Sequence, residues 1–158
     1  MILKASIFRP FFFGILPFFF VAILQSCGGA CAGNCGNGNC EQGVCVCDEG
    51  WEGTTCNTGW SEKFVGSYEG KDCYDSGIVR YIINKTNRPD SIIFDNQYHA
   101  IVKDGDNLIF PEQEAKADGV DFIFSGTGNI TNKGVDMLLF SKYPTFEIKC
   151  ELSLERTN

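Results

Sequence analysis

The stretch "TFEIKCELSLER", residues 145–156, alternates apolar and polar side chains along its whole length. Its apolar members fall on one side of an extended chain, and its charged and serine side chains fall on the other: Phe146, Ile148, Cys150, Leu152 and Leu154 against Glu147, Lys149, Glu151, Ser153 and Glu155. A period of two is typical of an antiparallel strand with one face on a core and one in water. The stretch therefore predicts a half-buried strand close to the C-terminus.

Seven further segments upstream have strand-like patterns, and turn signals such as "NRPD", "DGDN", "NKG" and "YPT" separate them. They are residues 63–73, 78–86, 91–95, 99–103, 107–110, 120–131 and 135–142. A single helical turn is expected only near Glu112–Lys116. About eight short strands joined by tight turns predict an up-and-down meander. A flat sheet of that size would leave two open edges, so we expect a small barrel or a closed sandwich.

Two cysteines and two glycines fit this meander. Cys73 lies in the first predicted strand and Cys150 in the last, and these strands become neighbours when a meander closes. We therefore expect a disulfide between them. Gly126 and Gly128 interrupt a long strand, which indicates a bend at a barrel corner.

Six more cysteines crowd into residues 31–56, "CAGNCGNGNCEQGVCVCDEGWEGTTC", with the spacing C-x3-C-x4-C-x4-C-x-C-x8-C. A segment this short cannot bury enough apolar surface to fold unaided, so it needs covalent cross-links. The spacing and the ending "CVCDEGWEGTTC" resemble an EGF-like module of the short kind found in tenascin-like repeats. The resemblance implies that the first cysteine pairs with the third, the second with the fourth and the fifth with the sixth: Cys31–Cys40, Cys35–Cys45 and Cys47–Cys56.

Metal ions and cofactors are not expected. A zinc site would require C-x2-C pairs, and the cluster has none. Calcium-binding EGF-like modules carry acidic residues just before the first cysteine, whereas "CGGA" stands there in this chain.

Residues 1–26 have the pattern of a signal peptide, with a basic start, an apolar centre and small or polar residues after it. The apolar centre is shorter than the ~20 residues of a membrane span, so an uncleaved anchor is the lesser alternative. Its end, "LQSC", resembles the lipobox of bacterial lipoproteins. This implies cleavage before Cys27, acylation of Cys27 and a lipidated linker over residues 27–30. The alternative is that Cys27 is one more disulfide cysteine and that cleavage occurs elsewhere.

The layout of the whole chain carries a second, looser resemblance. An EGF-like module followed by "KFVGSYEGKDCYDSG", residues 63–77, and by a β-domain over residues 61–158 is similar to small bacterial lipoproteins with a lipocalin- or calycin-like C-terminal part. That similarity raises the question whether aromatic side chains line a cavity. The candidates are Tyr81, Phe94, Phe122, Phe124 and Phe140. The alternative, which we favour, is that they fill the core of a barrel too small to have a cavity.

The net charge and the lack of catalytic motifs argue against two classes of function, nucleic-acid binding and catalysis. The formal charge is −7, and removal of Lys4 and Arg9 with the leader makes it −9, which argues against nucleic-acid binding. His99 is the only histidine, and no nucleophile motif accompanies it, so catalysis is not expected.

The sequence therefore predicts a mainly β protein with an N-terminal signal helix, lipid-anchored to the bacterial cell envelope at the outer membrane. Its EGF-like module would present a small barrel that binds a protein, a glycan or a small apolar ligand. One alternative is an envelope enzyme or enzyme inhibitor, for which "FPEQEAKADG", residues 110–119, is the longest candidate loop. Another is a eukaryotic secreted protein without lipid, whose sequons would be at Asn84 and Asn129.

Overall fold

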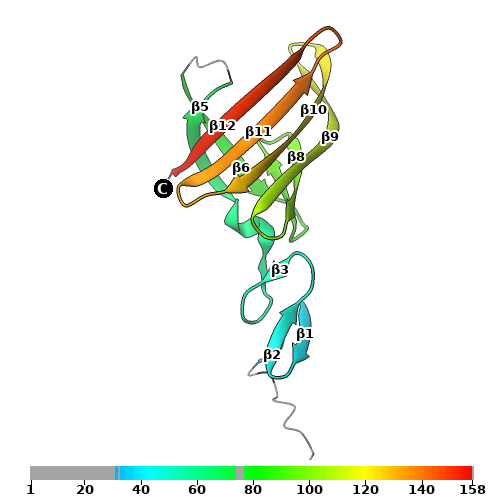
Figure 1. The fold of residues 1–158 in the computed structure, drawn as a ribbon, viewed down its shortest axis with the longest axis vertical. Coiled ribbons are helices and arrows are strands. Elements are labelled where there is room, and N and C mark those ends of the chain that lie inside the picture. Colours follow the sequence, from blue (N-terminus) through cyan, green and yellow to red (C-terminus); the bar gives the residue numbers. More distant parts are fainter. Residues whose placement is uncertain (1–30, 32, 74–76, 158) are drawn as a thin grey trace, which may run out of the picture.

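The structure, a computed structural model, describes residues 31, 33–73 and 77–157 (Figure 1). The leader, Cys27 and the predicted linker lie outside the described residues. A disulfide-rich N-terminal region comes first, and an eight-stranded closed antiparallel barrel follows it. Within the described ranges, no helix is long and apolar enough to cross a bilayer. The mainly β fold with about eight strands is confirmed.

The N-terminal region, called the module below, consists of two small hairpins held by three disulfides. Strands β1 (Gly38–Glu41) and β2 (Val44–Cys47) form the first hairpin, and β3 (Trp51–Glu52) and β4 (Thr58–Gly59) form the second. The disulfides are Cys31–Cys40, Cys35–Cys45 and Cys47–Cys56, the pairs that the resemblance implies.

The barrel is a meander in which each strand pairs with the next along the chain and the last pairs with the first. A 3-10 helix, η1 (Trp60–Lys63), connects the module to it. The strands are β5 (Gly66–Lys71), β6 (Ile78–Lys85), β7 (Ser91–Phe94), β8 (Tyr98–Lys103), β9 (Asn107–Ala117), β10 (Val120–Ile130), β11 (Gly134–Lys142) and β12 (Glu147–Thr157). The first and last strands, β5 and β12, pair with each other and close the barrel. The sheet therefore has no long unpaired edge strand.

Two predictions about residues 107–119 are wrong. The helical turn expected at Glu112–Lys116 is strand, and the candidate loop 110–119 is the second half of β9 with the tight turn Asp118–Gly119. A bulge opposite Phe124 and Gly126 explains the error. Before the bulge the even-numbered positions of β9 point inward, and after it Ala115 packs on the core, so the alternation appears broken. Pro111 is tolerated because it lies at this bulge.

Side chains fill the interior of the barrel. The buried core comprises Phe64, Tyr68, Tyr81, Ile83, Ile92, Phe94, Ala100, Val102, Leu108, Phe110, Phe122, Phe124, Val135, Met137, Leu139, Cys150, Leu152 and Leu154. Four of the five predicted aromatic residues belong to this core, which agrees with a packed interior. Phe140 does not, because Val135, Met137 and Leu139 take the inward positions of β11 and Phe140 has the opposite parity.

The end of the barrel next to the module is plugged by η1 and the residue after it. Phe64 is fully buried, and its carbonyl oxygen accepts a hydrogen bond from the Tyr68 hydroxyl at 2.7 Å. The Arg156 guanidinium lies over the Tyr68 ring, donates to its hydroxyl at 2.8 Å and donates to the Lys63 carbonyl oxygen. These bonds tie η1 to the first and last strands, so the module end is closed.

At the opposite, distal end the barrel wall is less regular. The β5–β12 ladder stops at the pair Glu69 and Glu155, and beyond it the Cys73–Cys150 disulfide joins the two edges. The β8–β9 ladder stops at Ile101. Beyond that point the Gln113 side chain replaces it, since its amide accepts from the His99 N–H at 2.9 Å and donates to the His99 carbonyl at 2.8 Å. Side chains therefore close both seams where the backbone ladders end.

Candidate binding site at the distal end of the barrel

Unequal strand lengths shape the distal end. Strands β7 and β8 have only 4 and 6 residues, whereas β9, β10 and β12 have 11 each. The β9–β10 and β11–β12 hairpins consequently project beyond the short β7–β8 hairpin at the end far from the module (Figure 1). The outermost apolar residues of these hairpins, Val120 and Phe146, are exposed, whereas Phe122 and Phe124 farther along β10 are buried.

Seven aromatic rings form a strip across this end. From β6 to the β11–β12 turn, the successive members are Tyr81, Phe94, Tyr98, Phe124, Phe122, Tyr143 and Phe146. Tyr98 stacks on Phe124 with ring centroids 3.9 Å apart. Tyr143 stacks on Phe122 at 4.9 Å and on Phe146 at 4.6 Å. Phe122 and Phe124 are neighbours on the inner face of β10, so β10 joins the two halves of this aromatic strip.

Exposure varies along the aromatic strip and is greatest at Phe146. The phenylalanines on β7 and β10 are buried, Tyr98 and Tyr143 are half-buried, and Phe146 is 55% exposed. Burial is the main cause that raises the pKa of Tyr81 and Tyr98, and the negative charge of Asp95 adds to it. Both hydroxyls therefore stay protonated at neutral pH and can donate hydrogen bonds.

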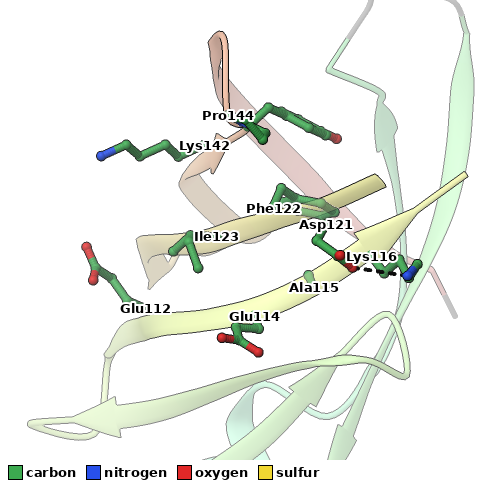
Figure 2. A pocket seen from close by; sticks show the side chains of 10 residues that line it. Glu112, Glu114, Ala115, Lys116, Asp121, Phe122, Ile123, Lys142 and Pro144 are labelled. Carbon is green, nitrogen blue, oxygen red and sulfur yellow. Dashed lines mark ion pairs between the residues drawn. The ribbon is translucent and has the colours of Figure 1, made fainter. Parts of the chain in front are cut away.

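A groove of about 690 Å³ adjoins the aromatic strip, because Phe122 and Tyr143 line both (Figure 2). Strands β9, β10 and β11 and the turn after β11 supply its other walls: Glu112, Glu114, Ala115, Lys116, Asp121, Ile123, Lys142 and Pro144. Lys116 pairs with Asp121 at 3.2 Å. The lining thus combines two aromatic rings with carboxylates and two ammonium groups that can hydrogen-bond a ligand.

A second groove, of about 460 Å³, crosses β9 to β12 nearer the module. Polar residues such as Thr127, Asn129 and Ser153 line it, and the Ser153 hydroxyl donates to the Asp136 carboxylate at 2.8 Å. It lacks an aromatic ring, so it is the weaker candidate.

The sequence identified part of this site. Four members of the aromatic strip were predicted as candidate lining residues, namely Tyr81, Phe94, Phe122 and Phe124, whereas Tyr98, Tyr143 and Phe146 were missed as a group. Tyr98 directly precedes a predicted strand, and Tyr143 belongs to the turn signal "YPT". Phe146 was assigned to a buried face, but it lies in the turn before β12 and is exposed. Only contacts between strands bring the three rings together.

His99 lies on the outer surface of β8 and is exposed. Its backbone pairs with Gln113, and within the described part of the chain no carboxylate or hydroxyl bonds to its ring. Asn84 and Asn129 are both exposed on the barrel.

The cysteine sulfurs do not offer a metal centre. The sulfur atoms of Cys31, Cys35 and Cys45 lie within 4.8 Å of one another, but all three belong to disulfides. A disulfide sulfur is not a thiolate and lacks the charge that zinc requires.

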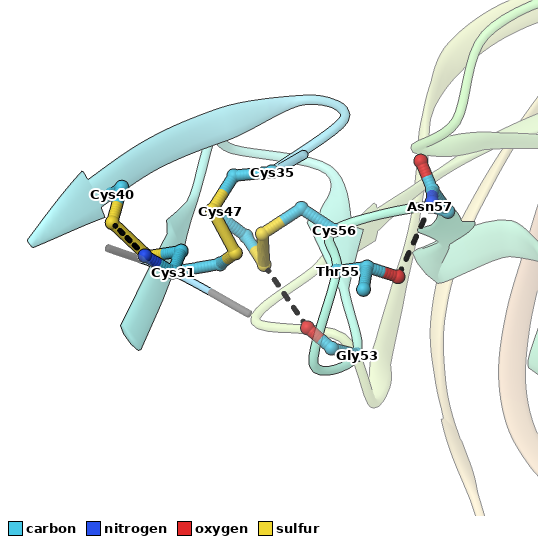
Figure 3. The surroundings of a disulfide bond; sticks show 9 residues. Cys31, Cys35, Cys40, Cys47, Gly53, Thr55, Cys56 and Asn57 are labelled. Carbon is cyan, nitrogen blue, oxygen red and sulfur yellow. Dashed lines mark hydrogen bonds between the residues drawn. A yellow bond between two sulfur atoms is a disulfide. The ribbon is translucent and has the colours of Figure 1, made fainter. Parts of the chain in front are cut away.

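The module docks on the plugged end of the barrel through specific contacts. Figure 3 shows Cys31 and Cys40 far from the barrel and Asn57 next to it. The Lys63 ammonium pairs with Glu52 of the module at 2.8 Å and with Asp106 of the β8–β9 turn at 3.0 Å. These bonds, headed by the Glu52 hydrogen bond, raise the pKa of Lys63.

The β6–β7 loop completes this junction. The Ser61 N–H donates to the Pro89 carbonyl at 2.8 Å, and an added Cβ on Gly59 would lie 3.1 Å from Pro89. Such close backbone packing fixes the module against the barrel.

No family model, no curated protein and no solved structure matches this chain. The site must therefore be interpreted from its own residues.

At this junction, we expect the stability of the fold to depend on the ionisation of Asp90. Both oxygens of the Asp90 carboxylate accept hydrogen bonds from Arg88, at 3.0 and 2.8 Å, and these bonds lower the pKa of Asp90 below its ordinary value of 3.8. A lowered pKa stabilises the fold above pH 3.8, and the contribution is lost as the pH falls through the folded-state pKa. Asp90→Asn should therefore lower the free energy of unfolding by up to about 1 kcal/mol at pH 7.

Urea unfolding of both proteins between pH 7 and pH 2.5 checks this prediction, and the difference between them should shrink below pH 3.8. Asp121→Asn is the control, because that carboxylate is 82% exposed and should matter less. A difference that stays constant across the range would contradict the prediction.

Proposed function

We propose that this protein is a lipid-anchored binding protein of the bacterial envelope. Acylated Cys27 holds it to the membrane, the EGF-like module acts as a stiff spacer, and the distal end of a lipocalin-like barrel takes the ligand. The observation that carries the proposal is the opposite placement of the module and the aromatic strip. The module occupies the plugged end, and the partly exposed rings occupy the other end.

The disulfides support export, since four of them persist only in an oxidising compartment. The remaining cysteine, Cys27, has the lipobox-like sequence before it. A spacer fixed to the barrel by Lys63 and by the Ser61–Pro89 bond keeps the orientation of the distal end defined.

Recognition is favoured over chemistry. The distal groove offers aromatic rings, carboxylates and ammonium groups, and its lining contains neither histidine nor cysteine. Its volume falls in the range of about 300–1,000 Å³ that is common for ligand pockets.

Mass spectrometry of the mature protein from bacterial membranes tests the anchor. A terminal peptide that begins at Cys27 and carries acyl mass supports the proposal, and Cys27→Ser should then remain an unprocessed precursor. A Cys27 in a disulfide, or cleavage at another residue without lipid, would overturn the anchoring and favour the secreted alternative.

A further inference from the structure

The distal end of the barrel carries recognition features that narrow the class of its ligand. We propose that the aromatic strip and the adjoining groove bind a neutral, β-linked glucose chain or a glycan of the same ring geometry. This inference rests on the proposed binding function and makes it specific.

One end of the aromatic strip presents a fixed and exposed ring. Tyr143 and Phe146 stack with an interplanar angle of 15°, so each holds the other in a fixed orientation. Phe146 is 55% exposed, which leaves it available to a ligand. A glucopyranose ring in the β configuration places its hydroxyls equatorially and presents C–H groups on both faces. Such a face can stack on a flat aromatic ring, as other apolar surfaces do.

Polar groups accompany the rings. Tyr98 and Tyr143 are half-buried members of the aromatic strip and carry hydroxyls, and Glu112, Glu114 and Lys142 line the adjoining groove. Carboxylates accept hydrogen bonds from sugar hydroxyls, and an ammonium group donates to their oxygens. Alternating apolar faces and hydrogen-bonding edges are the chemistry that a carbohydrate offers.

Other classes of ligand fit the distal end less well. A fatty acyl chain needs an apolar cavity, but core side chains fill the barrel interior. Laying the chain in the groove would desolvate Glu112 and Glu114 without a hydrogen-bond partner, which is unfavourable. A polyanionic glycan would be repelled by the same carboxylates and by the formal charge of −7. A neutral polyhydroxylated ligand avoids both costs.

Isothermal titration calorimetry of the full chain in detergent micelles, with cellohexaose as the probe, tests the inference. We expect saturable binding to the unaltered protein. Phe146→Ala should weaken it roughly tenfold, the effect of losing one stacked ring. Tyr143→Phe keeps the ring and removes the hydroxyl, so it should weaken binding only about threefold.

Val44→Ala is the matched control, because Val44 is 68% exposed and begins β2, which lies at the opposite end of the molecule from the β9–β10 and β11–β12 hairpins (Figure 1). It should bind cellohexaose as the unaltered protein does, and thermal unfolding should show that all variants fold. Absence of cellohexaose binding, or equal binding by Phe146→Ala, would overturn the inference. Palmitate or a proline-rich peptide that binds instead, with loss in Phe146→Ala, would also overturn it but would leave the binding function intact.

Discussion

Replacing both Cys73 and Cys150 by serine should lower the free energy of unfolding of the barrel by roughly 4 to 5 kcal/mol. The disulfide joins residues 77 positions apart, so its loss greatly increases the entropy of the unfolded chain. It also lies where the β5–β12 ladder has ended, so no backbone pairing compensates for it. Urea unfolding followed by circular dichroism measures the loss.

The matched control is Cys47→Ser with Cys56→Ser, whose sulfurs are only 9 positions apart. The shorter loop predicts a smaller entropic effect of roughly 3 kcal/mol. That effect should be confined to the module. A barrel that unfolds at the same urea concentration with and without the Cys73–Cys150 bond would contradict the prediction.

Gly134→Ala should also destabilise the barrel strongly, by about 3 kcal/mol or more. A Cβ built on Gly134 would lie 1.9 Å from the Leu154 carbonyl oxygen and 3.1 Å from the Arg156 nitrogen. Both are backbone atoms of β12, so the strand itself must move and the β11–β12 ladder must distort. A fall of roughly 10 °C in the midpoint of thermal unfolding is expected.

Gly33→Ala is the control for this prediction, since a Cβ there meets no atom within 4 Å. Its unfolding midpoint should stay within about 1 °C of the unaltered protein, as for most surface substitutions. Equal midpoints for Gly134→Ala and Gly33→Ala would show that β11 and β12 are not packed as described.

Much of the barrel was predictable because strand periodicity is a local property. The alternation in residues 145–156 places Cys150, Leu152 and Leu154 on one face, and all three are buried. Turn signals set the number of strands, and the avoidance of open edges predicted closure. Local patterns did not show which side chains point inward where two apolar residues are adjacent, as at Leu139 and Phe140. They failed again where an extra residue shifts the alternation, as at the β9 bulge.

The candidate site was less predictable than the fold. Tyr98, Phe122 and Tyr143 are far apart in sequence, and their ring contacts depend on the register of β10 against β9 and β11. Likewise, nothing in the local sequence of Arg156 indicates that it binds Tyr68 and the Lys63 carbonyl. Register and closure are cooperative properties of the whole sheet.

By itself, the sequence determined most of the barrel strands and predicted both closure and the four disulfides of the described residues, because side-chain alternation and cysteine spacing are written along the chain. Only the tertiary structure decided which end of the barrel is plugged and which carries the exposed rings. The physical reason is that both ends are built from residues on different strands, and only the closed hydrogen-bond ladder and the packed core bring those residues together.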